Sequence, residues 1–457
     1  MKHTPPRSLK KFLIIPLLLS LGAFFLWNYS PVTAKTQDTY KSLETFASVL
    51  SLVQENYVEE VDGQKAIEGA IRGMLNSLDP HSSYMKPDDF KELQVETQGI
   101  FSGIGIEITM RDNILTVVSP IEGTPAFKKG LKAGDSILKI NDEPTQDMSL
   151  MEAVKRLRGP KGTEVTVSIH RKGWTELKDF TIVRDVIPIH SVKSRMLEPG
   201  YSYIRISNFQ TQTTTDFKKA LDDMAKSGEV KGLILDLRNN PGGLLDQAVK
   251  VADIFIDDGV LVSTKGRIKE QNSIFRAHNG NGKYTFPLVV LVNEGSASAS
   301  EIVAGALQDH KKALILGAQT FGKGSVQTIV PMDNGAGLRL TTARYYTPSG
   351  RSIQATGITP DVIVATAVQP ADSEAREKEE DPEKKPRFLR EKDLRHHIGN
   401  GQKENSAPQE KADTEAESGE ENGKLLQEEL SRDQQLSSAL MLLKGLHVFG
   451  GGARAGK

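Results

Sequence analysis

The spacing of apolar residues divides the chain into stretches with different periods. Between Tyr40 and Tyr57 apolar residues recur at helical spacing, and a second helix is predicted from Lys65 to Leu78. From Gly99 the period shortens to that of strands separated by glycine turns, and residues 187–365 alternate strand and helix. Successive strand–helix units predict a mostly parallel sheet with right-handed crossovers. The chain is therefore predicted to be a multidomain α/β protein.

The stretch VNEGSASASEIVAGALQD, residues 292–309, holds the sharpest change of period. A buried parallel strand is predicted from Pro287 to Asn293, and helical spacing begins after Ala297. Ser298 would then lie in the first turn of a helix, where unpaired N–H groups and the positive end of the dipole favour an oxyanion. The simpler alternative is that Ser296, Ser298 or Ser300 only caps the helix.

The stretch QTFGKGSVQ, residues 319–327, offers a base for such a serine. A strand over 323–330 would place Lys323, Ser325 and Gln327 on one face. Lysine acts as a base only when burial lowers its pKa from about 10.4 toward neutrality. Gln327 can orient the amine without adding charge, whereas a neighbouring acid would hold the ammonium form. The alternative is a solvated loop lysine.

A Ser-His-Asp triad has little support in the sequence. His310 follows Ser298 by twelve residues on one helix, which separates them by about 18 Å. His278 lies in a loop rich in Asn and Gly, and neither His81 nor His190 has a recognisable acid partner. The pair His396-His397 lies in a charged tail, so no metal site is predicted.

The first 34 residues have the pattern of a targeting segment. Basic residues precede an apolar run from Phe12 to Trp27, and small residues at 32–34 suit a signal peptidase. A cleaved signal and a retained anchor both fit, and cleavage is favoured. The chain has no cysteine, which excludes disulfides, thiolate zinc sites, a cysteine nucleophile and a lipoprotein anchor. A net charge of −1 gives no general attraction to nucleic acid.

The C-terminal part changes character twice. Residues 371–431 are rich in Glu, Lys and Arg, which predicts disorder. Helical spacing returns at 431–446, with an apolar stripe at Leu436, Ala439, Leu440 and Leu443 that must dock on its own body or on a neighbour. We predict that this stripe or the one at 43–53 forms a subunit interface, giving a homo-oligomer.

Residues 98–186 resemble a PDZ domain. Gly103-Ile104-Gly105-Ile106 matches the carboxylate-binding loop, and AGDSILKIND matches the central strand. Such domains bind a peptide as an extra strand and hold its terminal carboxylate with backbone N–H groups. The resemblance implies a pocket lined by Ile104 and Ile106 together with Leu150, Ala153 and Val154.

Residues 40–367 resemble the carboxy-terminal processing peptidases, or tail-specific proteases. The match rests on GSASASE, on FGKG with Lys323 25 residues after Ser298, on Gln327, and on residues 338–361. The resemblance implies a crotonase-like or ClpP-like core with an inserted PDZ domain and no metal or cofactor. It implies Ser298 as nucleophile, Lys323 as general base and Gln327 as its orienter. The oxyanion hole would be the N–H of Ala299 with that of Gly242 or Gly243.

The protein is therefore expected to be an exported, periplasmic serine endopeptidase. It would bind apolar protein C-termini through the PDZ domain and cleave near them through an acyl-enzyme, touching a membrane only through its N-terminal segment. Whether an adaptor protein takes part is left open. The predicted regions are a signal or anchor (1–34), N-terminal helices (35–97), PDZ domain (98–186), protease core (187–367), disordered linker (368–430) and C-terminal helix (431–450).

Two other functions remain open at this point. A non-catalytic periplasmic scaffold that binds C-termini would leave Ser298, Lys323 and Gln327 unexplained, and an acyl-CoA enzyme would have little use for a PDZ domain. We also expect the PDZ domain to gate the active site. Arg158, in the turn LRGPKG, is the expected sensor that bridges PDZ domain and core, the alternative being an ordinary surface arginine.

Overall fold

The computed structural model describes residues 33–111, 114–188, 190–280, 284–365, 389–399, 426 and 430–454. The chain forms two compact units, 1–74 and 75–457, which are described separately. The predicted targeting segment lies outside the described residues apart from Thr33 and Ala34. Within the described ranges, no helix is long and apolar enough to cross a membrane.

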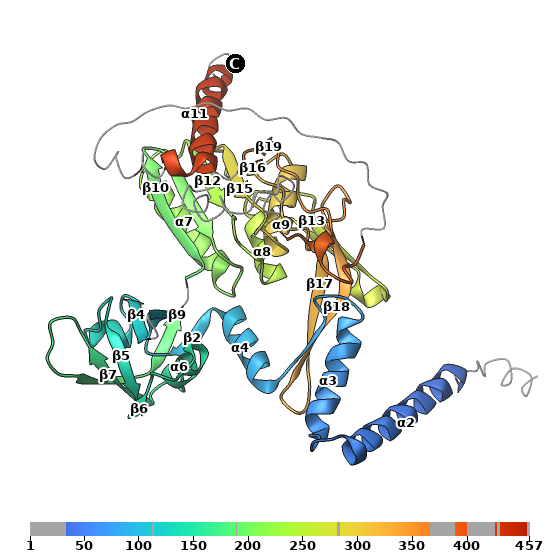
Figure 1. The fold of residues 1–457 in the computed structure, drawn as a ribbon. Helices are drawn as coiled ribbons and strands as arrows, with labels where there is room; N and C mark the ends of the chain where they lie inside the picture. The colour runs from blue at the N-terminus through green and yellow to red at the C-terminus, as the bar shows by residue number, and fades with distance from the viewer. Residues whose placement is uncertain are drawn as a thin grey trace, which may run out of the picture. The chain divides into compact units, whose positions relative to one another are not determined.

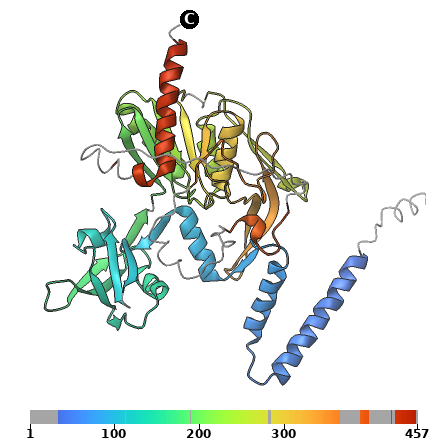
Figure 2. The ribbon, with the colours of Figure 1, turned by 45° about the horizontal axis from the view of Figure 1, so that its top comes forward.

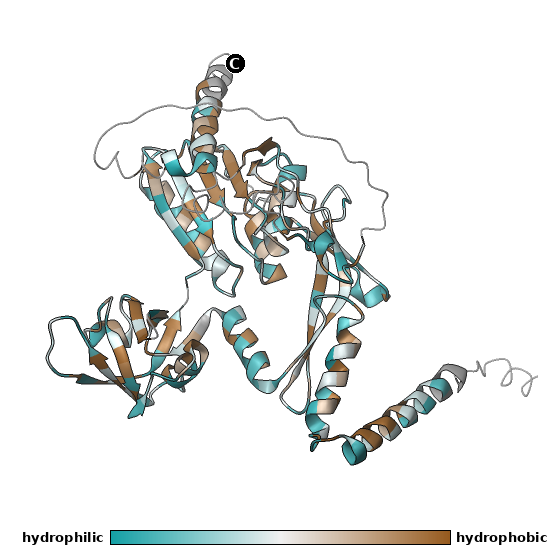
Figure 3. Cartoon of the chain, in the orientation of Figure 1, coloured by the Kyte–Doolittle hydropathy of each residue, from teal (hydrophilic) through white to brown (hydrophobic). Residues whose placement is uncertain are grey.

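The first unit consists of helix α2 (Thr33–Asn56) and most of helix α3 (Gly63–Asn76), where the periodicity predicts helices. The carboxylate of Asp62 caps α3 by accepting the Gln64 N–H at 2.9 Å. Hydrophobic residues run along α2 (Figure 3), and its stripe faces solvent, with Leu43 56% exposed.

The second unit contains the predicted PDZ domain. Its main sheet has the order β3-β4-β5-β7-β8, with β6 beside β5, and β2 pairs with β9. Alternate residues of β7 (Val165, Val167 and Ile169) are fully buried, which is the period of a sheet with one covered face. The bounds are α4 (Pro87–Gln98), β2 (Ile100–Gly103), β3 (Ile106–Arg111), β4 (Ile114–Pro120), α5 (Pro125–Lys128), β5 (Ser136–Ile140), β6 (Glu143–Pro144), α6 (Leu150–Leu157), β7 (Glu164–His170), β8 (Lys178–Val183) and β9 (Asp185–Pro188).

The core contains a six-stranded sheet of order β10-β11-β12-β15-β16-β19, in which every pair after the β10–β11 hairpin is parallel. Helices α7, α8 and α9 cover one face and α11 the other (Figures 1 and 2). The bounds are β10 (Val192–Glu198), β11 (Tyr201–Ile206), α7 (Thr213–Lys226), β12 (Gly232–Asp236), α8 (Leu245–Asp253), β15 (Leu288–Val292), α9 (Ala299–Asp309), β16 (Leu314–Gly317), β19 (Val362–Ile363) and α11 (Gln434–Arg454).

A second, antiparallel sheet has the order β1-β18-β13-β14, with β17 also beside β18. The β17–β18 hairpin turns at Asn334-Gly335, and Gly335 has a φ of +79°. The bounds are β1 (Ser83–Met85), β13 (Val260–Gly266), η1 (Lys269–Gln271), β14 (Ser273–Arg276), β17 (Ser325–Pro331) and β18 (Gly337–Tyr346).

The C-terminal stripe packs on the protein's own sheet. Leu436, Ala439, Leu440 and Leu443 of α11 are at most 3% exposed and contact the face that carries Ile234, Val289 and Leu291. Each buried leucine contributes roughly 1.5–3 kcal/mol to this docking. The stripe is thus covered without a partner, and the predicted subunit interface rests on α2 and stays a prediction.

The prediction of disorder over 368–430 does not hold throughout. Residues 389–399 are described within it and include the short helix η3 (Glu391–Asp393), whose first residue is fully buried. Composition does not predict order in residues 389–399, because the sequence around Glu391 is as rich in charged residues as the rest of the linker.

Candidate active site

Ser298 stands between buried strand β15 and helix α9, where the sequence predicts it. Its backbone has φ 53° and ψ −111°, an uncommon conformation for a residue with a side chain. Such strain costs about 1–3 kcal/mol and persists only where the surroundings fix it. Within the described structure the Ser298 side chain makes no capping hydrogen bond, which disfavours a purely capping role.

The two neighbouring serines have structural partners. Ser296 Oγ donates to Leu237 O at 2.8 Å, and Ser300 Oγ donates to Asn240 O at 2.9 Å. Both side chains are fully buried, and they join the turn after β12 to the turn after β15 and to the first turn of α9. Ser298 is half-buried, so it is the serine of the three that solvent and substrate can reach.

The RNNPGG turn after β12 lies directly against Ser298. Gly242 has φ +106°, and a Cβ there would stand 2.8 Å from Ser298 Cβ, so only glycine allows this approach. The Gly242 N–H donates to Asn240 Oδ1 at 2.9 Å. In contrast, the N–H groups of Gly243 and Ala299 have no acceptor among the described residues. These two donors therefore remain for an oxyanion.

Glu301 connects the segments of the serine and the lysine. Its Oε2 accepts the Ser298 N–H at 2.8 Å and the Lys323 N–H at 2.9 Å. Its Oε1 accepts from Thr320 Oγ1 at 2.5 Å and the Gly322 N–H at 2.8 Å. Burial raises the pKa of Glu301 to about 7, against these four hydrogen bonds, which favour the ionised form.

Lys323 has the environment that a lysine base requires. Its pKa is lowered mainly by desolvation and further by the positive charge of Arg339. The carboxylates of Glu391, Glu301 and Asp79 act in the opposite direction. No hydrogen bond joins Lys323 Nζ to Ser298 Oγ in the described structure. Catalytic hydrogen bonds often shorten only when substrate binds.

Gln327 lies on β17, two residues after Ser325, and its Nε2 donates to Ser325 Oγ and to Thr341 Oγ1 at 3.2 and 2.9 Å. Its Oε1 is buried and has no hydrogen-bond partner among the described residues. An unpaired buried acceptor is costly unless it acquires a donor, and an ammonium group is a suitable one. β17 begins at Ser325, so Lys323 precedes the strand, whereas the sequence predicted a strand from residue 323. The register shift between Val326 and Gln327 leaves Thr342 of β18 without a partner on β17.

The predicted peptide groove is a cavity of about 250 Å³ between β3 and α6. Five of the predicted residues line it: Gly103, Ile104, Gly105, Ile106 and Val154. Leu150, at the start of α6, is partly exposed and outside the lining, and Ala153 points into the domain core. The lining also includes Phe101, Glu107, Ile108, Leu157 and Arg158.

Arg158 lies at the C-terminal end of α6 and contacts α4 as well as Phe101, which lines the same groove. Its Nη1 lies 2.5 Å from Glu92 Oε1 on α4, and its guanidinium stands 5.1 Å from the Phe101 ring centroid. Lys155, also on α6, forms a second ion pair with α4, in which its Nζ lies 2.7 Å from Asp88 Oδ2. Two ion pairs thus join α6 of the PDZ domain to α4.

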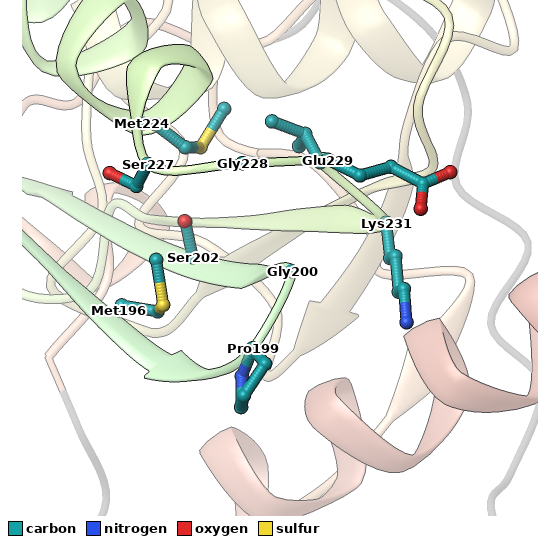
Figure 4. A pocket seen from close by; sticks show the side chains of 10 residues that line it. Met196, Pro199, Gly200, Ser202, Met224, Ser227, Gly228, Glu229 and Lys231 are labelled. Carbon is teal, nitrogen blue, oxygen red and sulfur yellow. The ribbon is translucent and has the colours of Figure 1, made fainter.

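A separate cavity of about 280 Å³ opens where the β10–β11 turn meets the end of α7. Figure 4 shows Met196, Met224 and Lys231 around it. No candidate catalytic residue lines this cavity in the described structure.

Two functional candidates escaped the sequence reasoning. Glu301 has a recognisable signature, because Ser298-x-x-Glu301 has the form of a capping box. His81 has no acid partner that is recognisable in the sequence, yet its Nε2 lies 2.7 Å from Glu391 Oε2, 310 positions away. His190 likewise has Asp216 Oδ2 3.6 Å from its Nδ1.

The chain is similar to known proteins over most of its length. The family model Peptidase family S41 matches residues 200–364, a PDZ domain model matches 102–195, and the model Activating protease CtpB N-terminal domain matches 28–89. The carboxy-terminal-processing protease of Bartonella bacilliformis is 44% identical over 442 residues, covering 95% of each chain. The carboxy-terminal processing protease CtpA of Bacillus subtilis is 37% identical over 362 residues, or 78% of this chain and 77% of that protein. A solved structure titled photosystem II D1 C-terminal processing protease is 33% identical and covers 72% of this chain and 94% of its own, with a TM-score of 0.42.

Proposed function

The chain belongs to peptidase family S41 and is a serine peptidase of the carboxy-terminal processing type, and on this premise we propose that it is an exported Ser–Lys endopeptidase. The observation that carries the mechanism is the Glu301 carboxylate, one oxygen of which binds the backbone of both Ser298 and Lys323. The targeting pattern of residues 1–34 supports export to the periplasm.

The proposed reaction has two halves. Ser298 Oγ attacks the scissile carbonyl carbon while Lys323 Nζ takes the hydroxyl proton. The N–H groups of Gly243 and Ala299 stabilise the oxyanion, and Lys323 returns the proton to the departing amine. Water then attacks the acyl-enzyme, with Lys323 again as base, and releases the new carboxyl terminus. Gln327 Oε1 accepts a hydrogen bond from the amine and orients it.

The two competing functions are less well supported. A non-catalytic scaffold leaves the lowered pKa of Lys323 and the unpaired Gln327 oxygen without a purpose. An acyl-CoA enzyme gives no role to a peptide groove beside Gly103–Ile106.

Recognition of the substrate C-terminus predicts a requirement for its α-carboxylate. Amidating that carboxylate in a peptide with an apolar C-terminus is expected to lower kcat/KM about 10- to 100-fold, because charge-assisted hydrogen bonds are lost. Ile106→Asp should lower cleavage of the free-acid peptide similarly, while Lys172→Ala, on an exposed turn of the same domain, should not. Equal kcat/KM for acid and amide peptides would exclude this mode of recognition.

Gating through Arg158 is the regulatory part of the proposal, but its described contacts, with Glu92 on α4 and Phe101 on β2, do not reach the protease core, contrary to the sequence prediction. The proposal is therefore that Arg158 acts through α4. Arg158→Ala is expected to raise cleavage of a short peptide that needs no C-terminal recognition by about 2- to 5-fold. The effect is small because an exposed ion pair contributes only about 0.2–1 kcal/mol. The measurement is kcat/KM on that peptide, with Lys172→Ala as control. Unchanged cleavage would leave Arg158 an ordinary surface arginine.

A further inference from the structure

Glu391 is a fully buried carboxylate that the proposed reaction does not use. It is carried by residues 389–399, beyond the last strand of the core. Its Oε2 lies 2.7 Å from His81 Nε2, and its Oε1 accepts from Gln354 Nε2 at 2.8 Å. A buried charge is costly unless it is paired and hydrogen-bonded, so these partners explain how the segment remains docked.

The contacts of Glu391 reach both sides of Lys323. The Glu391 N–H donates to Phe321 O at 3.2 Å, two residues before the lysine. Gln354, held by the Glu391 side chain, accepts the Gly324 N–H at 3.0 Å, one residue after the lysine. The loop that carries the base is therefore fastened from outside the peptidase core.

The same cluster extends to Gln327. Asp79 accepts the His81 N–H at 2.8 Å and Thr341 Oγ1 at 3.0 Å. Thr341 Oγ1 in turn accepts from Gln327 Nε2 at 2.9 Å. The His81–Glu391 pair thus joins the loop of the base to the residue proposed to orient it.

We propose that Glu391 is a positioning residue for the general base, which fixes the Lys323 loop through Phe321 and Gln354 and adds a negative charge beside the amine. The inference rests on the proposed Ser298–Lys323 mechanism. The charged groups that act on Lys323 are Arg339, which favours the neutral amine, and Glu391, Glu301 and Asp79, which favour the ammonium. His81 lies between Asp79 and Glu391 and belongs to the same cluster.

The charge is tested by Glu391→Gln in the full chain. The variant keeps the shape of the side chain but removes a charge that favours the ammonium, so the pKa of Lys323 should fall. The acidic limb of the kcat/KM profile is then expected to move to lower pH by roughly half a unit or more. The exposed Lys392→Gln, on the same turn, should leave the limb in place. An unmoved limb in a folded Glu391→Gln protein would overturn the role of the charge.

The positioning is tested by Glu391→Asp, which retains the charge but shortens the side chain by one methylene. Its acidic limb should stay near that of the unsubstituted protein, while kcat falls about 3- to 10-fold because Gln354 loses its anchor. Unchanged kcat would overturn the positioning role, even if Glu391→Gln failed to fold. An unsubstituted protein without an acidic limb would instead refute the lysine base, so the two failures are distinguishable.

Discussion

Lys323→Arg is expected to abolish proteolysis in a protein that remains folded. A guanidinium does not lose its proton at working pH, so the variant keeps the positive charge but provides no base. Loss of a general base typically costs about 10²–10⁴-fold in rate. The measurement is kcat on a polypeptide with an apolar C-terminus. A thermal unfolding curve shows whether the variant is folded. Lys269→Arg, on the exposed η1 turn, is the matched control and should retain full activity.

The pH profile of the unsubstituted protein belongs to the same prediction. Lys323 acts only when neutral, so the rate must rise as pH increases through its pKa. Burial lowers that pKa from 10.5, so the rise is expected at lower pH than for a solvated lysine. A flat profile between about pH 6 and 9, with chemistry limiting the rate, would contradict a titrating lysine.

Ser298→Ala is expected to lower kcat by at least about 10³-fold without unfolding the protein. The backbone at φ 53° is equally strained for both residues, and the described side chains offer no capping bond to lose. Stability should therefore change by less than about 1 kcal/mol.

Ser300→Ala is the matched control for the nucleophile. It removes the buried hydrogen bond to Asn240 O and should destabilise the protein by about 1–3 kcal/mol, while the folded fraction stays active. A fully active Ser298→Ala protein would remove the serine from the mechanism.

Local sequence patterns predicted helices, strands and turns, but not contacts between distant segments. The change of period around Ser298 predicted strand, turn and helix. The strained φ of Ser298 and the shared carboxylate of Glu301 arise from contacts between segments. The capping-box spacing marks Glu301 but does not indicate that it also binds the Lys323 loop.

Other features depend on contacts that no short window contains. The apolar stripe of α11 predicted that this helix docks on another surface. It did not predict which surface, because apolar side chains can pack on any apolar face. The pairing of His81 with Glu391 joins residues 310 positions apart, and the acidic partner lies in a segment whose composition predicts disorder. The register shift between Val326 and Gln327 also depends on the partner strand, β18, so the sequence of β17 alone does not predict it.

Covalent labelling tests the central claim, a Ser298 nucleophile activated by Lys323, most directly. The full chain is treated with a fluorophosphonate that reacts with activated serine hydroxyls, and the adduct is located by peptide mass spectrometry with its rate of formation. We expect a single adduct on Ser298, absent in Ser298→Ala and at least about 10²-fold slower in Lys323→Arg. An adduct on another serine, or labelling of Lys323→Arg at the rate of the unsubstituted protein, would contradict it.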